Sequence, residues 1–202
     1  HTYKQTDVEA IRTIHHTTVF LLNLVRGRYK ARFPALKGSI GDTPSCSILQ
    51  TITGVDEIRP GNYVFYDLTQ QHIGSCSFSE IAMCMACPVI AKHPERNEII
   101  VHGGSVHFSK DSLVGADGSL IYGRVVELTE NGWSEPLEGL EVVSLSQEHG
   151  TIRASKALFD RYRVGDLMGI LPVHSCLTAD VMGGYTTLDG KRLEHLSGIG
   201  QV

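Results

Sequence analysis

Near the C-terminal end of the sequence a histidine and a cysteine stand two residues apart, as His174 and Cys176 in the segment Pro172-Val173-His174-Ser175-Cys176-Leu177-Thr178. The apolar run 167–171 comes directly before this segment. If that run is a strand continuing through the pair, both side chains point to one face, because side chains alternate along an extended backbone. An imidazole and a thiolate suit zinc, and two protein ligands leave positions for water or substrate, which favours a catalytic metal. The alternative is a strand end with a buried thiol and a surface histidine, because His-x-Cys alone is a weak pattern.

A second set of polar groups lies in two turns of the N-terminal third. The first turn, Gly41-Asp42-Thr43-Pro44-Ser45, offers a hydroxyl and turn amides. The second, Arg59-Pro60-Gly61-Asn62-Tyr63, offers the backbone N–H groups of Gly61 and Asn62, and Gly61 has no Cβ to hinder a close approach. Loops with such donors after neighbouring strands can hold a phosphate dianion, and in (β/α)8 barrels this cradle commonly follows the last two strands. Two ordinary turns are the alternative.

The elements that would position these turns are typical of β/α units. Residues 6–29 predict a helix, with Thr6 as N-cap and Glu9 completing a capping box. Short strands are expected at 35–40 and 63–66. Helix, strand, loop and strand at these intervals indicate a parallel arrangement.

After about residue 70 the pattern changes. Short alternating runs separated by turn residues occupy 97–101, 119–126, 140–145 and 166–171. The dipeptides Asp117-Gly118 and Asn131-Gly132 favour hairpin turns. This part of the sequence therefore predicts a mostly antiparallel β domain.

Composition excludes several classes of protein. The 202 residues have a formal net charge of -4, and their 42% hydrophobic content is enough for a core in one or two domains. No basic block is present, which argues against nucleic acid as a partner, and no apolar run reaches membrane-spanning length. With no signal peptide in view, the five cysteines indicate reduced thiols in a cytoplasmic protein. The pair Cys84 and Cys87 lies in an apolar stretch and is interpreted as buried core cysteines.

Taken together, these motifs resemble the D-serine dehydratase and D-threonine aldolase family, pyridoxal-phosphate enzymes of fold type III that share the alanine racemase type of barrel. Each segment is weak alone, but they follow the family's order and span nearly the whole chain. The matching segments are His1-Thr2-Tyr3, 41–45, 57–67, Ser109-Lys110-Asp111, Ser146-Gln147-Glu148-His149-Gly150 and 172–178.

The resemblance implies a fold and a set of cofactor contacts. The implied fold is α/β plus β, with the last β/α units of a (β/α)8 barrel in 1–70 and a mostly antiparallel, D-serine dehydratase-like β domain in 71–202. By the resemblance, the cofactor phosphate rests on a hydroxyl and two backbone amides, a tyrosine contacts the cofactor, and an arginine hydrogen-bonds the pyridine nitrogen. A salt bridge at the barrel rim is the alternative for the arginine. The implied residues are Thr43, Gly61 and Asn62 for the phosphate, Tyr3, and Arg59.

The resemblance also implies a chemistry. His174 and Cys176 match the zinc ligands of the dehydratase branch, where zinc acts as a Lewis acid near the substrate's β-hydroxyl. The expected function is part of a pyridoxal-phosphate- and zinc-dependent lyase that converts D-β-hydroxy amino acids into a 2-oxo acid and ammonia. The alternatives are a D-threonine aldolase, an amino-acid racemase of the same fold, or a non-catalytic fragment. Glu148-His149 either orients a zinc ligand or closes a turn.

Departures from the family limit this expectation. Family members are about twice this length, so the sequence resembles a C-terminal portion without the first half of the barrel. No lysine, including Lys4, Lys37 and Lys110, stands in the context of the Schiff-base lysine, so the chain alone is expected to be inactive. Asp42 would place a carboxylate near the phosphate, which is unfavourable unless it points away. Family enzymes are usually homodimers, and exposed strand edges predict that the isolated chain dimerises, aggregates or pairs with the missing half.

Overall fold

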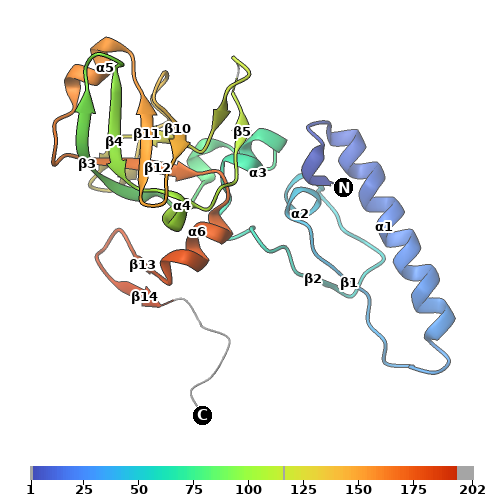
Figure 1. Cartoon of the computed structure of the whole chain (residues 1–202). Coiled ribbons are helices and arrows are strands. Elements are labelled where there is room, and N and C mark those ends of the chain that lie inside the picture. Colours follow the sequence, from blue (N-terminus) through green and yellow to red (C-terminus); the bar gives the residue numbers. More distant parts are fainter. Residues whose placement is uncertain (1, 116, 195–202) are drawn as a thin grey trace. The chain divides into compact units, whose positions relative to one another are not determined.

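The computed structural model describes residues 2–115 and 117–194 (Figure 1). The chain divides into two compact units, His1–Glu80 and Ile81–Val202. The predicted boundary at residue 70 falls inside helix α3 (Leu68–Ile73), and the observed division comes after the short helix η2 (Phe78–Glu80). No helix in the described ranges has both the length and the hydrophobicity that crossing a membrane requires.

The first unit contains one long helix and one pair of short parallel strands. Strand β1 pairs with β2 in parallel, and this agrees with the expected β/α arrangement. The predicted strand at 63–66 is wrong, because these residues form a turn in which Tyr66 has a positive φ of 50°. Besides α3 and η2, the elements are η1 (Thr2–Lys4), α1 (Val8–Tyr29), β1 (Ser39–Ile40), α2 (Thr43–Ile48) and β2 (Glu57–Ile58).

The N-cap of helix α1 lies one residue later in the sequence than predicted. Asp7 is the N-cap, and its carboxylate accepts hydrogen bonds of 3.2 Å from the backbone N–H groups of Glu9 and Ala10. A carboxylate that accepts two of the free N–H groups at a helix start is a better cap than the hydroxyl of Thr6. The cap prediction was therefore wrong by one residue, although the helix itself is confirmed.

The second unit is built on a closed barrel of six strands. The strands follow the order β10-β11-β4-β3-β12-β7, and every neighbouring pair is antiparallel. The prediction of a mostly antiparallel β domain is thus confirmed, although β3 and β11 were not predicted as separate strands. Their bounds are β3 (Met85–His93), β4 (Glu98–His102), β7 (Gly123–Val126), β10 (Glu141–Leu145), β11 (His149–Arg153) and β12 (Leu167–Pro172).

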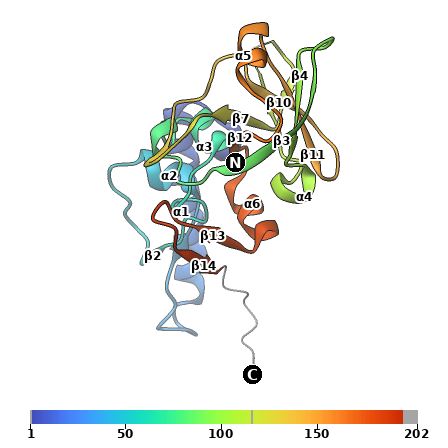
Figure 2. The same ribbon diagram turned by 90° about the vertical axis from the view of Figure 1, so that its left-hand side faces the viewer.

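Short helices and two-stranded hairpins lie outside the six strands of this barrel. Helix α5 (Lys156–Arg161) lies at one end, whereas α4 (Ser105–Phe108) and α6 (Ser175–Met182) lie at the other, as both views show (Figure 2). Helices α4 and α6 also contact each other. The hairpins are β5 (Leu113–Val114) with β6 (Leu120–Ile121), β8 (Leu128–Thr129) with β9 (Gly132–Trp133), and β13 (Gly184–Thr186) with β14 (Arg192–Glu194).

The barrel interior is filled by branched aliphatic side chains from alternating strand positions, as expected for a small barrel. Val101, Val125 and Ile170 are fully buried there. Cys87 belongs to the same core, and Cys84 is partly buried beside β12, where burial raises the pKa of each thiol to about 12. The interpretation as a buried core cysteine is confirmed for Cys87, whereas Cys84 is only partly buried.

Candidate functional site

In the first unit, the loops that follow β1 and β2 are drawn together by a close backbone approach. A Cβ at Gly41 would lie 2.3 Å from the carbonyl oxygen of Arg59, so only glycine fits there. Next to this approach, the Asn62 backbone N–H donates to Thr43 Oγ1 over 3.1 Å, and both residues are buried. The structure therefore brings together the predicted hydroxyl and one of the two predicted amides. Gly61 is adjacent, and no atom lies within 4 Å of a Cβ built on it.

Two buried polar atoms in these loops are unsatisfied. Ser45 Oγ and Asn62 Oδ1 have no hydrogen-bond partner among the described residues. Leaving a buried polar atom unpaired costs about 1–3 kcal/mol, so such atoms are places where a polar ligand or ordered water is expected. The Ser45 and Thr43 hydroxyls can donate into the open space at Gly61, whereas Asn62 Oδ1 can only accept a hydrogen bond, for example from ordered water. A phosphate group fits this cradle by its chemistry.

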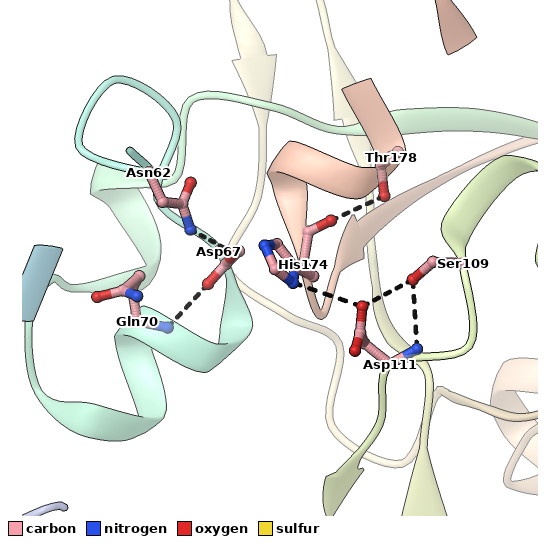
Figure 3. A network of polar contacts seen from close by, with 7 residues as sticks. All are labelled: Asn62, Asp67, Gln70, Ser109, Asp111, His174 and Thr178. Atoms are coloured by element: carbon pink, nitrogen blue, oxygen red, sulfur yellow. Dashed lines mark hydrogen bonds and ion pairs between the residues drawn. The ribbon is translucent and has the colours of Figure 1, made fainter. Parts of the chain in front are cut away.

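Asp67 holds the second loop in place, and sequence reasoning did not identify it. Its carboxylate is almost fully buried and accepts from Asn62 Nδ2 and from the Gln70 backbone N–H, the latter over 2.8 Å (Figure 3). It is thereby the N-cap of α3. The signal was an aspartate just before an apolar helix start, which is a typical capping position.

The other residues expected near this cradle are Tyr3, Arg59 and Asp42. Tyr3 lies in the short helix η1, which contacts α1, α2 and α3. Arg59 is exposed, and its Nε donates to Ser39 Oγ over 2.9 Å. Among the described residues Arg59 forms no ion pair, and both interpretations of its role stay predictions. Asp42 caps α2 by accepting from the Ser45 N–H over 2.9 Å, so its carboxylate is held in that cap.

In the second unit, His174 and Cys176 lie at the start of α6 and not in a strand. Strand β12 ends at Pro172, and His174 is the N-cap of α6, with Cys176 in the first turn. The Thr178 N–H and hydroxyl both donate to the His174 carbonyl oxygen, over 3.2 and 3.1 Å, and this winds the chain into a helix. The expected alternation along a strand was therefore the wrong local geometry. Both side chains are partly exposed.

His174 has an acidic neighbour that sequence reasoning did not assign to the site. The Nδ1 atom of His174 lies 3.4 Å from Oδ2 of Asp111, and Ser109 Oγ donates to the same carboxylate oxygen over 2.9 Å (Figure 3). The Ser109-Lys110-Asp111 segment matched the family motif, and that match was the available signal. No group of three or more His, Cys, Asp or Glu side chains in the described ranges is arranged to hold a metal, so a metal here would rest on few protein ligands.

Glu148 and His149 close the turn between β10 and β11. The Ser146 N–H donates to the His149 carbonyl over 2.9 Å, and the Gly103 N–H donates to the Glu148 carbonyl over 3.0 Å. The first contact closes the hairpin of β10 and β11, and the second joins its turn to the loop after β4. Of the two interpretations, the turn is the one that these contacts support.

Comparison with known proteins gives a family match that lies within the second unit. A family model described as "Putative serine dehydratase domain" matches residues 82–188, almost the whole described part of the second unit. A D-serine dehydratase from Dictyostelium discoideum is 34% identical over 159 residues, which are 75% of this chain and 39% of that protein. The chain thus spans well under two thirds of this relative.

Solved structures of similar fold match more of this chain than the family model does. An alanine racemase-like protein from Idiomarina loihiensis matches with a TM-score of 0.81 and 30% identity, over 95% of this chain and 52% of that one. A D-threo-3-hydroxyaspartate dehydratase with one cysteine changed to alanine, in the metal-free form, matches with a TM-score of 0.82, 26% identity and coverages of 96% and 52%. A second mutant of that enzyme, with a histidine two positions earlier changed to alanine, matches with a TM-score of 0.81, 25% identity and coverages of 96% and 51%. The family match covers more than half of the chain, and the chain belongs to the D-serine dehydratase family.

Proposed function

We propose that this chain is part of a pyridoxal-phosphate- and zinc-dependent lyase that acts on D-β-hydroxy amino acids. The reaction removes the Cα proton and the β-hydroxyl as water, and hydrolysis of the released enamine gives a 2-oxo acid and ammonia. The chain's family and the dehydratase names of its relatives support this proposal. The observation that carries it is the imidazole and thiol pair at the start of α6.

The metal assignment rests on donor chemistry and on one relative. A neutral imidazole and a thiolate are ligands that zinc prefers. In D-threo-3-hydroxyaspartate dehydratase, mutants of a cysteine and of a histidine two positions before it have been solved, the cysteine mutant in a metal-free form. His174 and Cys176 have the same spacing. We therefore assign them as the zinc ligands.

The cofactor assignment rests on the cradle of the first unit. The Thr43 hydroxyl and the amides of Gly61 and Asn62 would hold the phosphate dianion, and the unsatisfied Ser45 Oγ offers another donor. Arg59, already held through its Nε by Ser39, keeps its terminal N–H groups for the pyridine nitrogen. Tyr3 would contact the cofactor from η1.

The chain's own residues contribute binding and orientation. When bound, pyridoxal phosphate supplies an electron sink for the electron pair left at Cα, and zinc supplies a Lewis acid for the β-hydroxyl. The cradle fixes the phosphate end, and the pair on α6 holds the metal. No lysine of this chain is assigned to hold the cofactor, so we place that lysine in residues that the longer relatives have and this chain does not span. On this proposal the 202-residue chain binds the metal but does not turn over substrate.

The first prediction concerns the metal. The chain, dialysed against zinc and then against metal-free buffer, retains near-stoichiometric zinc, and His174→Ala and Cys176→Ala each lose most of it, because a single protein ligand holds zinc poorly. Zinc is measured by elemental analysis of the protein fraction. His93→Ala, which removes another partly exposed imidazole of the same unit, retains zinc like the unmodified chain. Equal zinc in His174→Ala and His93→Ala would remove the basis of the assignment.

The reaction itself is separated from its alternatives by products. In a full-length protein that contains this chain, pyruvate and ammonia from D-serine identify the dehydratase. Glycine and an aldehyde from D-threonine identify an aldolase, and loss of optical activity without either product identifies a racemase.

A further inference from the structure

We propose that Asp111 is a positioning residue that holds the His174 imidazole so that Nε2, and not Nδ1, is the nitrogen offered to the metal. The proposal rests on the proposed function, because it assigns a role toward the same zinc. Asp111 comes from the loop after α4, and its Oδ2 lies 3.4 Å from His174 Nδ1 (Figure 3). The side chain thus reaches the ligand from a different element than α6.

Asp111 is itself held in place. Ser109 Oγ donates to Asp111 Oδ2 over 2.9 Å and accepts from the Asp111 N–H over 3.2 Å. The two contacts close a small ring that fixes both the backbone and the carboxylate of Asp111. The acid is therefore oriented before any metal arrives.

Ser109 adopts a backbone conformation that serine rarely takes. Its φ is +68° with ψ of -164°, at the C-terminal end of α4. A non-glycine residue in this region is strained, and such strain persists where the surrounding structure requires a particular geometry, often at functional sites. Here that conformation delivers the Ser109 hydroxyl to Asp111. A serine in place of the glycine that the backbone would prefer is explained by this contact.

The chemistry of imidazole links the contact to metal binding. A neutral imidazole carries its proton on one nitrogen and offers a lone pair on the other. A carboxylate beside Nδ1 favours the proton on that atom, which leaves the Nε2 lone pair for a metal. Metal-bound histidines commonly have such a carboxylate partner, which fixes the ring and makes the ligand more basic.

The position of the pair argues against a role in stability alone. The side chains of His174 and Asp111 remain 39% and 42% exposed. Ion pairs this exposed contribute little to folding, because water and salt screen them. Orientation of a ligand needs only that one geometry is favoured over others. The test is therefore built on tautomer and metal affinity instead of stability.

The first arm of the experiment uses the metal-free chain. Long-range proton–nitrogen correlation spectra of the ¹⁵N-labelled protein at pH 8 should show His174 mainly with its proton on Nδ1. Asp111→Ala should shift it toward the Nε2–H form, which predominates in unconstrained imidazoles. Asp160→Ala, which removes a comparably exposed carboxylate paired with Lys156 on α5, should leave His174 unchanged. A wild-type His174 already protonated on Nε2, or an unchanged tautomer in Asp111→Ala, would overturn the proposal.

The second arm measures zinc affinity by competition with a chromophoric chelator. Asp111→Ala should raise the zinc dissociation constant about 10–100-fold, the usual effect of losing such a partner. Ser109→Ala should raise it less, because Asp111 remains, and Asp160→Ala should have no effect. Unchanged affinity in Asp111→Ala refutes the positioning role. If the unmodified chain binds no zinc at all, the proposed function fails, whereas the tautomer in the first arm still decides whether Asp111 orients His174.

Discussion

At the scale of single residues, the close approach at Gly41 decides whether the two loops of the cradle can meet. The nearest atoms to a Cβ at this position are backbone atoms of Arg59, which cannot move aside as a flexible side chain would. Gly61, in the partner loop, faces open space. Two glycines of one candidate site therefore have opposite steric demands.

A substitution pair tests this difference. Gly41→Ala should destabilise the chain by about 1–3 kcal/mol, the usual cost of overpacking, and separate Thr43 from Asn62. Gly61→Ala should change stability by less than about 0.5 kcal/mol, as is usual for surface substitutions away from special features. Urea unfolding of both variants measures the effect. If the two alanines cost the same, the approach at Gly41 is not what holds the loops together.

The residues themselves were predictable to different degrees. Thr43 and Asn62 could be paired from the sequence, because loops after adjacent parallel strands lie at one edge of a sheet. The Asp67 cap is local, because Asn62 and Gln70 lie within five residues of it, whereas the contact of Asp111 with His174 joins residues that are close only in three dimensions. His174 and Cys176 were found by residue type, but with the wrong backbone conformation, because nothing in their own sequence marks where β12 ends and α6 begins.

At the scale of elements, helix α1 is apolar on two sides. Ile11 and His15 are buried against the rest of the first unit. Another set of apolar side chains on α1 is more than half exposed, namely Phe20, Leu21, Leu24 and Val25. A helix with apolar residues on both sides normally packs between two neighbours.

In pure solution a second copy of the chain offers an apolar surface of the same kind to this face of α1. The longer relatives contain residues that this chain does not span, and those residues are absent from the test tube. We therefore expect the isolated chain to self-associate through α1. Leu21→Lys with Leu24→Lys should weaken association about tenfold or more, because two half-exposed leucines supply roughly 2 kcal/mol of burial.

Analytical ultracentrifugation over a concentration series measures this association. The matched control is Thr13→Lys with Thr17→Lys, which adds the same two charges to α1 without removing apolar surface. Equal weakening by both double variants would point to charge repulsion. A monomer at every concentration would refute self-association.

The barrel strands were easier to predict than the elements of the first unit. Short apolar runs between turn residues placed β4, β10 and β12 to within one residue at each end, whereas the single run 119–126 covers both β6 and β7. The strands of the first unit are only two residues long, too short for any periodicity. The apolar segment at 63–66 then suggested a strand where the backbone turns.

At the scale of the whole molecule, two histidines connect stability to pH. Burial lowers the pKa of His15 below its ordinary value of 6.5, with Asp42 acting in the opposite direction and His16 in the same one. Burial also lowers the pKa of His107, helped by His102 and opposed by Glu148. A lowered pKa means that the unfolded chain binds these protons more readily than the folded chain. The stability that the two neutral histidines contribute is therefore fully present above pH 6.5 and is lost as the pH falls through their lowered pKa values.

Unfolding by urea should show this loss. The free energy of unfolding should fall as the pH is lowered from 7.5 to 5, a range above the titration of carboxylates such as Asp56, whose pKa is lowered by the Gly38 N–H and Arg26. His15→Gln should flatten part of this dependence. A free energy that is level across this range would contradict the assignment.

Closure of the six strands into a barrel has a consequence for how the gene segment that encodes it can recombine. The residues matched by the family model, 82–188, lie within the one uninterrupted stretch that forms the second unit. Each pairing among the described strands stays inside a single unit, so a cut between residues 80 and 81 breaks one peptide bond and no ladder. A gene segment starting there encodes a barrel whose six strands leave no free edge among themselves, which favours its joining to another scaffold.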